Sequence, residues 1–326
     1  MIYLAPLQGY TEKPFRFAWS SFFTGIDLAI SPFIPLSESF VFKAKHLEDV
    51  IPEANEGLTV IPQILGNDSR KFVELCKRLH DLGYNEVNWN LGCPKSTVTR
   101  KKRGAGMLPF PDIIREILTK SIPQLPVQLS VKTRLGLNSP DEFVELIQVY
   151  NDFPLKSLMI HPRTGIQMYD GTMHLDVLDR TLYQIIHPVV FSGDIAGEAS
   201  YRLISSRFPT IQHWMIGRGI LVNPFLPEIL TRGKNHLTED NIRRRQYYFH
   251  DELFCELRAR LKHERTILNK LKDYWSYFSK WFCNDHMIFD QLTHKNTLSA
   301  FMTTARDILR NEALSAFGTR TGLPIK

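Results

Sequence analysis

Short runs of β-branched and other apolar residues recur at fairly even spacing along the first two thirds of the chain, each bounded by turn residues. Stretches with the periodicity of amphipathic helices, such as residues 69–82 and 140–150, lie between them. The runs that predict strands are Ile2–Ala5, Asp27–Ser31, Thr59–Leu65, Glu86–Leu91, Val127–Thr133, Ser157–His161, Val189–Ser192 and His213–Ile216. The chain therefore alternates predicted strands and helices over about 230 residues.

Eight strands that alternate with helices are the element count of an α/β protein with a (β/α)8 TIM barrel, whose usual length is ~250 residues. A doubly wound open sheet is the competing fold. The pattern favours the barrel because the number of strands matches closure without additions. In addition, the first strand is not followed by the G-x-G-x-x-G turn of dinucleotide-binding sheets.

The pattern changes in the last part of the chain. From about Thr238 to Phe317 no strand-like run appears, and Arg, Lys, Leu and aromatic residues recur at helical spacing. Thr238 is a suitable N-cap for a long helix over residues 241–261, and later breaks give three or four helices. We therefore expect a catalytic barrel over residues 1–232 and a smaller, C-terminal all-helical domain over residues 233–326.

Aromatic residues gather in the predicted helical domain. Tyr274, Phe278, Trp281 and Phe282 recur at helical spacing, which favours a domain core. A surface on which nucleic-acid bases stack is the alternative.

Composition excludes several classes of protein. Hydrophobic residues make up 43% of the 326 residues, too many for a disordered chain. The four cysteines, Cys76, Cys93, Cys255 and Cys283, form no C-x-x-C pair, which indicates a reducing compartment. Neither a signal peptide nor an apolar run near the roughly 18 residues of a membrane span is present. We expect a cytoplasmic monomer with no metal ion and no membrane partner.

Positive charge is concentrated in the predicted helical domain. The net charge of the chain is +6. Residues 233–326 hold 16 Lys and Arg against 11 Asp and Glu, whereas residues 1–232 hold 24 against 23. The surplus includes Arg243, Arg244 and Arg245, which would line one or two helix faces toward an anionic partner.

Polar side chains follow the predicted strands at the points where a barrel builds its active site. The candidates are Pro6, Leu7 and Gln8 after the first strand, Gln63 in the third, Asn90 and Cys93 at the fourth, Lys132 and Arg134 at the fifth, His161 at the sixth, Ser192, Gly193 and Asp194 at the seventh, and Gly217 and Arg218 at the eighth. We expect their amide, thiol, ammonium and imidazole groups to converge on one mouth.

The loops after the last two strands predict a phosphate site. Gly193 and Gly217 permit close approach of the backbone, and Arg218 adds a charged donor. Either loop alone is typical of an ordinary turn. Together they match the position at which barrels of this kind often hold a phosphate.

Lys132 lies in an apolar run, where an ammonium group is costly to bury without an anionic partner. The electron-rich edge of a reduced flavin would supply that partner, and Gln63 would bond the pyrimidine edge of the same ring. His161 taken alone is typical of a hydrogen-bonded core histidine.

Cys93 lies on a loop over the predicted mouth. An inert buried thiol is the ordinary state of a cysteine. A thiol with the usual pKa of about 8.5 is nevertheless protonated at neutral pH and can act as an acid. The following segment carries Arg100, Lys101, Lys102 and Arg103, and we expect a mobile basic loop that is either solvated or in contact with a polyanionic substrate.

The sequence Asn90-Leu91-Gly92-Cys93-Pro94, followed by Lys95 and Arg103-Gly104-Ala105-Gly106, is a specific marker. Further motifs are Leu4–Thr11, Val131–Arg134, His161–Thr164, Ser192–Ile195 and Met215–Gly219. In this combination and order the chain resembles the flavin-dependent tRNA-dihydrouridine synthases, over most of its length. One departure is Ser192, because members of the family usually carry Asn at this position.

The resemblance implies a barrel that binds FMN and a helical domain that holds tRNA. The isoalloxazine would be surrounded by Pro6, Leu7, Gln8, Gln63, Lys132 and His161. Ser192, Gly193, Asp194, Gly217 and Arg218 would hold the ribityl phosphate end, and Asn90, Arg134 and Tyr169 would lie nearest the uracil. FMN would take hydride from NADPH and deliver it from N5 to C6 of uridine, while Cys93 protonates C5. RNA contacts would come from Arg100, Lys101, Lys102, Arg103, Arg243, Arg244 and Arg245.

Two other functions stay open at this point. A flavin barrel that reduces a free pyrimidine, as in proteins similar to dihydroorotate dehydrogenase, would not need a basic helical domain. An RNA-binding protein that keeps the barrel without turnover is the non-enzymatic alternative, and it would purify without flavin colour.

Overall fold

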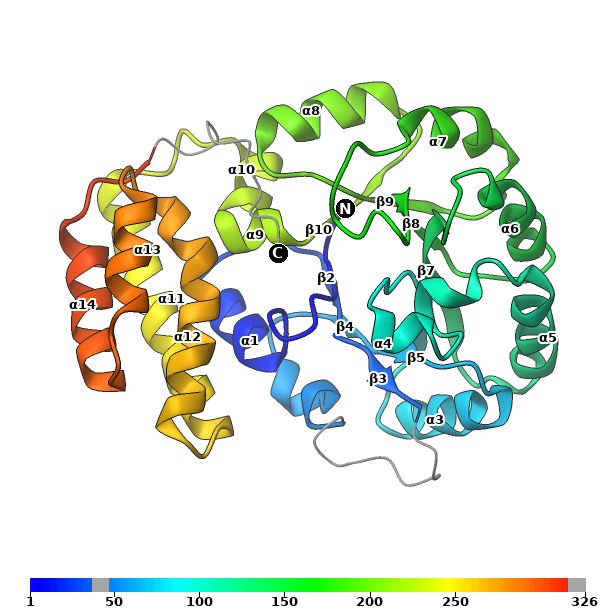
Figure 1. Cartoon of the computed structure of the whole chain (residues 1–326), viewed down its shortest axis with the longest axis horizontal. Coiled ribbons are helices and arrows are strands. Elements are labelled where there is room, and N and C mark those ends of the chain that lie inside the picture. Colours follow the sequence, from blue (N-terminus) through cyan, green and yellow to red (C-terminus); the bar gives the residue numbers. More distant parts are fainter. Residues whose placement is uncertain (37–46, 316–326) are drawn as a thin grey trace.

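The computed structural model describes residues 1–36 and 47–315, so Phe317, at the predicted end of the helical domain, lies outside the described residues. Figure 1 shows two neighbouring parts, a set of strands surrounded by helices and a separate group of helices formed by the C-terminal segment. None of the described helices is both long enough and apolar enough to cross a membrane.

Ten parallel strands of the described chain form one sheet in the order β3-β5-β6-β7-β8-β9-β10-β1-β2-β4. They are β1 Ile2–Leu4, β2 Leu28–Ile30, β3 Ile34–Pro35, β4 Val60–Ile61, β5 Gln63–Leu65, β6 Glu86–Leu91, β7 Gln128–Gly136, β8 Leu158–Thr164, β9 Val189–Ser192 and β10 His213–Ile216. Each of the eight predicted strands is present.

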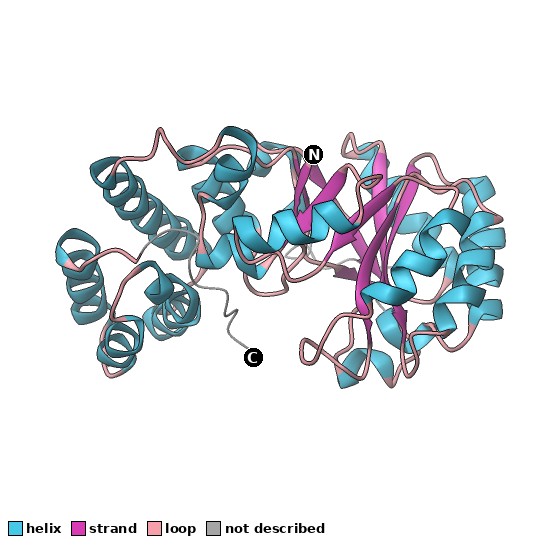
Figure 2. Ribbon diagram, turned by 90° about the horizontal axis from the view of Figure 1, so that it is seen from above, coloured by secondary structure: helices cyan, strands magenta, loops and turns pink. Residues whose placement is uncertain are grey.

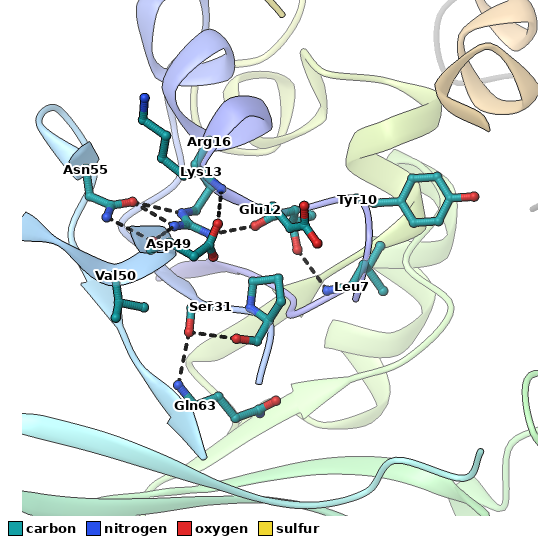
Figure 3. A network of polar contacts seen from close by, with 12 residues as sticks. Leu7, Tyr10, Glu12, Lys13, Arg16, Ser31, Asp49, Val50, Asn55 and Gln63 are labelled. Carbon is teal, nitrogen blue, oxygen red and sulfur yellow. Dashed lines mark hydrogen bonds and ion pairs between the residues drawn. The ribbon is translucent and has the colours of Figure 1, made fainter. Parts of the chain in front are cut away.

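Breaks at two prolines explain how ten short strands make a barrel of eight. Pro32 lies in the break between β2 and β3, and Pro62 separates β4 from β5. β2 and β3 are the two pieces of one barrel strand, and β4 and β5 are the two pieces of the next. Because β2 pairs with β4 and β3 pairs with β5, these two strands join the two ends of the sheet, and the barrel closes. Proline has no N–H for the ladder, and the Ser31 hydroxyl accepts from the Gln63 N–H at 3.1 Å across the break (Figure 3). The predicted (β/α)8 barrel is confirmed.

Helices cover the outside of the barrel, as Figure 2 shows. They are α1 Lys13–Phe22, α3 Ser69–Asp81, α4 Ser96–Thr99, α5 Pro111–Ser121, α6 Glu142–Asn151, α7 Leu175–Thr181, α8 Glu198–Arg207, α9 Arg218–Val222 and α10 Leu226–Arg232. In α3, the Asp68 carboxylate caps the helix by accepting from the Lys71 N–H at 3.1 Å, and the apolar face is buried. Apolar side chains such as Tyr3, Ile61 and Met159 fill the interior of the barrel.

Four helices follow residue 233 in the described chain. They are α11 Glu239–Arg260, α12 Glu264–Phe278, α13 Asp285–Thr293 and α14 Leu298–Asn311. Thr238 caps α11 as predicted, because its hydroxyl accepts from the Asn241 N–H at 3.3 Å. Phe278 and Trp281 stack with centroids 4.4 Å apart and are almost fully buried. The aromatic cluster is therefore a core. Whether residues 1–232 and 233–326 fold independently stays a prediction.

Candidate active site

A cavity of about 400 Å³ opens among loops that follow the carboxyl ends of the strands. This volume lies in the range of ~300–1,000 Å³ that is typical of ligand pockets. The predicted site residues that line it are Pro6, Leu7, Gln8, Asn90, Cys93, Lys132, Arg134, His161, Tyr169, Ser192, Gly193, Asp194, Gly217 and Arg218. Residues from six strand ends thus meet at one mouth.

Gln63 is the predicted cofactor residue that does not line the cavity. Its side chain is fully buried inside the barrel, where Nε2 donates to Asn88 Oδ1 at 2.7 Å. Its Oε1 accepts from Asn90 Nδ2 at 2.8 Å. Each end of the amide keeps one further hydrogen-bonding site, so the expectation that Gln63 bonds a ring in the cavity stays a prediction. In the structure, Gln63 orients Asn90.

Asn90 in turn holds the loop that carries the cysteine. Its Oδ1 accepts from the N–H groups of Gly92 and Cys93, at 3.1 and 2.9 Å. The predicted substrate residue therefore has a clear positioning task. Burial raises the pKa of the Cys93 thiol, and the nearby Lys95, Arg134 and Lys132 oppose this effect only in part. The Cys93 thiol is therefore protonated at neutral pH, and Cys93 lines the cavity.

Two cations lie beside this thiol. Within the described chain, the Lys132 ammonium makes no hydrogen bond or ion pair. Burial, together with the positive charge of Arg134, lowers the pKa of Lys132 to about 8. Arg134 is held firmly, because Nε donates to Gly92 O at 2.9 Å and Nη1 donates to Thr164 O at 2.7 Å. Burial lowers the pKa of Arg134 to about 10, so it stays charged at neutral pH. The cavity thus contains an ammonium group in need of an anion.

His161 is neutral in this setting. Burial, followed by the positive charge of Arg134, Lys132 and Arg163, holds the pKa of His161 well below its usual value. Its Nε2 lies 3.2 Å from Arg163 Nη1, which can only donate, so Nε2 accepts and the proton resides on Nδ1. His161 therefore offers a neutral hydrogen-bond donor to the site.

Arg163 is a site residue that the sequence interpretation missed. It binds both carboxylate oxygens of Asp194, at 2.9 and 2.5 Å, and Arg218 reaches the same carboxylate at 3.3 Å. Asp194 is therefore neutralised, and the Arg218 guanidinium leaves a positive end in the cavity. The signal was available in the sequence, because Arg163 lies two residues beyond His161 and alternate strand residues point to the same side.

The two glycine loops pack closely together. A Cβ at Gly219 would lie 2.2 Å from the carbonyl oxygen of Ile195, and one at Gly217 would lie 3.2 Å from Ala5 Cβ. Only glycine allows the loops after β9 and β10 to approach in this way. Ser192 and Gly193 line the cavity beside them.

Tyr169 lies in the loop after β8, in contact with two arginines. The guanidinium carbons of Arg134 and Arg218 lie 5.4 and 5.3 Å from its ring centroid, within the range of cation–π contacts. Burial raises the pKa of Tyr169, so the phenol is neutral. Tyr169 thus adds an aromatic wall between the two ends of the cavity.

The basic loop after Cys93 is folded, which differs from the expected mobile loop. It forms α4 and a 3-10 turn over Gly104–Met107. Asn67 fixes it by donating to the carbonyls of Lys101 and Lys102, both at 3.1 Å, and by accepting from Arg103 Nε at 3.2 Å. The side chains of Arg100 and Lys101 are exposed.

The three arginines of α11 do not share one surface, because successive helix residues are rotated by ~100°. Arg245 faces the barrel, where it binds Glu228 at 2.5 Å and donates to Phe22 O at 2.8 Å. Arg243 binds Glu239 at 2.7 Å. Arg244 alone of the three is exposed, and it makes no ion pair within the described chain. The expectation that all three face RNA therefore does not fit Arg245.

The structure adds wall residues that the sequence did not single out. Tyr10 and Lys95 come from the loops after β1 and β6, and Tyr277 comes from α12 of the helical part. Tyr277 could have been found only from the tertiary fold, because its helical spacing indicates a core position equally well. The cavity is thus built by both parts of the chain.

Comparison with known proteins shows the family of this chain. A family model for dihydrouridine synthases matches residues 3–314. The chain belongs to the dihydrouridine synthase family. Membership makes it a flavoprotein oxidoreductase, and the resemblance seen in the sequence is confirmed at the level of the family.

Relatives and solved structures agree with this assignment. A tRNA-dihydrouridine synthase B of Pasteurella multocida (strain Pm70) is 28% identical over 236 residues, covering 70% of this chain and 68% of the relative. The protein of the same name from Escherichia coli (strain K12) is 25% identical, with 68% of each covered. The old yellow enzyme homologue of Zymomonas mobilis has a TM-score of 0.51 at 11% identity, covering 73% of this chain and 90% of that one. The last likeness supports the barrel fold alone.

Proposed function

We propose that this dihydrouridine synthase reduces uridine to 5,6-dihydrouridine in tRNA, with FMN as its cofactor and NADPH as the reductant. The relatives named tRNA-dihydrouridine synthase B support the substrate. The observation that carries the proposal is the pair of Cys93 and Lys132 in one cavity. A protonated thiol suits the donation of a proton, and an ammonium group without a partner suits an anionic ring edge.

The residues of the cavity fit FMN in charge and shape. Lys132 and neutral His161 offer donors for the electron-rich edge of the ring. Arg218 and the close-packed glycine loops would hold the phosphate, with Arg163 cancelling the charge of Asp194. When bound, the flavin supplies the hydride, from its N5 to C6 of uridine, after reduction by NADPH.

Cys93 supplies the proton that completes the reduction. Addition of hydride at C6 builds enolate charge on a C5=C6 bond conjugated to a carbonyl, and an acid near C5 must quench it. Burial keeps the thiol protonated until that charge develops. Arg134 and Tyr169 would border the uracil, and Asn90 would keep the thiol in place through the two N–H groups that it accepts.

The substrate must reach this cavity as an extruded base. A uracil within folded tRNA is stacked, and its extrusion costs a few kcal/mol, roughly, which phosphate contacts must offset. The exposed Arg100 and Lys101 beside Cys93, and Arg244 on α11, are the described candidates for these contacts. A tRNA substrate would also match the cytoplasmic location expected from the cysteine pattern.

A substrate comparison tests the proposal. Purified protein with FMN and NADPH is incubated with an unmodified tRNA transcript, and in parallel with free uridine, uracil and orotate. Mass spectrometry of the digested tRNA should show uridine that has gained two hydrogens, while the free pyrimidines stay unreduced. Faster reduction of a free pyrimidine than of tRNA would favour the alternative of a small-molecule reductase. Protein that binds no FMN would favour the non-catalytic RNA-binding alternative.

A further inference from the structure

One face of α12 contacts the loop that follows β1. Lys270, Tyr274 and Tyr277 are spaced four and three residues apart, so they lie on the same side of the helix. The Lys270 ammonium donates to Gly9 O, and the Tyr274 hydroxyl donates to Tyr10 O at 2.6 Å. The helical part therefore holds two consecutive carbonyls of a barrel loop.

Aromatic contacts extend the same joint. The Tyr10 ring packs edge-on against Tyr274 and Tyr277, with centroids 5.7 and 5.3 Å apart. The Lys270 ammonium lies 5.4 Å from the Tyr10 centroid and 5.5 Å from that of Tyr274. Such contacts fix a ring as well as a backbone.

This loop is one wall of the active-site cavity. The cavity is lined by Pro6, Leu7, Gln8 and Tyr10 of this loop. Tyr277 of α12 also lines it. The loop turns at Gly9, where φ is +85°, a conformation that disfavours other residues. Its shape therefore depends on contacts as well as on local sequence.

Local contacts and α1 hold the ends of the loop. The buried Thr11 hydroxyl donates to Ala5 O at 2.8 Å and accepts from the Leu7 N–H at 2.8 Å. Arg16 donates to Thr11 O at 2.7 Å. Figure 3 shows Leu7 and Arg16 at these ends, with the Tyr10 side chain pointing away from the Arg16 network. At the tip, the Tyr10 N–H donates to Leu7 O at 2.8 Å within the loop, and α12 binds the carbonyls of Gly9 and Tyr10.

We propose that Lys270 and Tyr274 are positioning residues for the cofactor, so that the helical part is a component of the flavin site as well as an RNA-binding part. This inference rests on the proposed FMN site. Burial lowers the pKa of Lys270, so the side chain is desolvated at the joint and the carbonyl of Gly9 takes the place of water. Removing either donor leaves a loop carbonyl without that partner and lets the cavity wall move.

The test measures FMN affinity in single variants of the full chain. Lys270→Met and Tyr274→Phe each remove one donor and keep most of the side chain. Equilibrium titration with FMN, followed by quenching of flavin fluorescence, should give a dissociation constant about threefold to tenfold above that of the wild type, as expected for one lost hydrogen bond. Lys270→Arg, which keeps a donor, should restore most of the affinity.

Two control variants match these changes on the same helix. Lys272→Met removes a lysine that donates to Thr293 O at 2.7 Å, and Ser276→Ala removes a hydroxyl that donates to Asp273 O at 2.6 Å. Neither touches the loop after β1, so both should bind FMN like the wild type. Melting temperatures of all variants separate a loss of stability from a loss of positioning.

The outcomes distinguish this inference from the proposed function. Wild-type affinity in Lys270→Met and Tyr274→Phe would overturn the positioning role while leaving the FMN site intact. Equal weakening in the Lys272→Met control would also overturn it, because the effect would then belong to the helix as a whole. A wild-type protein that binds no FMN would instead overturn the proposed function.

Discussion

Cys93 illustrates how position decides the chemistry of a single residue. Cys76 is fully buried in α3 among apolar side chains, where it can only pack. Cys93 has the same thiol, but Asn90 holds it at the mouth of the cavity beside Lys132 and Arg134. The pKa of both thiols is raised by burial. Of these two cysteines, Cys93 lines the cavity, and for this reason the proposed acid role belongs to it.

Lys132 predicts how cofactor binding depends on pH. Its pKa of about 8 means that the ammonium is present below pH 8 and is lost as the pH rises through that value. A reduced, anionic flavin stabilises the ammonium form. We therefore expect the dissociation constant of reduced FMN to rise about tenfold between roughly pH 7 and 9, measured by anaerobic titration with tryptophan fluorescence as the signal.

The Lys132→Met variant provides the control for this pH dependence. It should bind reduced FMN more weakly than the wild type at pH 7, and its affinity should not follow the same rise. A pH dependence that persists unchanged in Lys132→Met would assign the titration to another group.

At the level of single residues, sequence reasoning placed most of the cavity wall correctly but not every role. Strand-end positions put Lys132, His161 and Arg218 at one mouth without any knowledge of the fold. Gln63 begins β5 and its side chain is buried in the barrel. Its hydrogen bond to Asn90 could not be predicted from the sequence, because it joins two different strands.

Among elements, strands and surface helices were predictable because their patterns are local. The loop over residues 95–107 was not, because its order comes from Asn67 on a different loop. The wall contributed by α12 was also beyond the sequence. A helix face that packs on a barrel and a helix face that lines a ligand cavity have the same apolar spacing.

Substitutions of two neighbouring arginines of α11 should have different effects, one on tRNA binding and one on stability. Arg244→Ala removes an exposed charge, so it should weaken tRNA binding and lower the salt slope of the affinity by about one, with little change in stability.

Arg245→Ala leaves Glu228 buried without its main partner, so it should cost about 3 kcal/mol of unfolding free energy in a urea titration. If Arg245→Ala were as stable as the wild type, its ion pair would not be a docking contact.

In the whole molecule, a polar network joins the helical part to the barrel. Arg16 of α1 is buried and binds Asp49 at 3.0 Å and Asn55 at 2.8 Å (Figure 3). Asp49 also binds Arg260 of α11 at 3.1 Å. Arg245 and Arg260 of the helical part thus bind barrel carboxylates, those of Glu228 and Asp49. The charge that remains for an RNA partner is smaller than the sequence total and lies on fewer side chains.

Both parts of the chain meet at the cavity, and this arrangement suits a large substrate. A free pyrimidine would need only the barrel, whereas under the proposed function a tRNA would contact the basic loop beside Cys93 and the helical part at once. The barrel was predictable from strand count. How the helical part docks was not, because it depends on contacts such as Tyr274 with Tyr10 that join residues far apart in the chain.

The most direct measurement is a map of dihydrouridine in tRNA from cells that lack this protein. Deletion should remove dihydrouridine from one or more tRNA positions. Wild-type protein should restore it, and Cys93→Ala should not, because loss of a general acid costs a factor of ~10²–10⁴ in rate. An unchanged map after deletion, or full restoration by Cys93→Ala, would contradict the account.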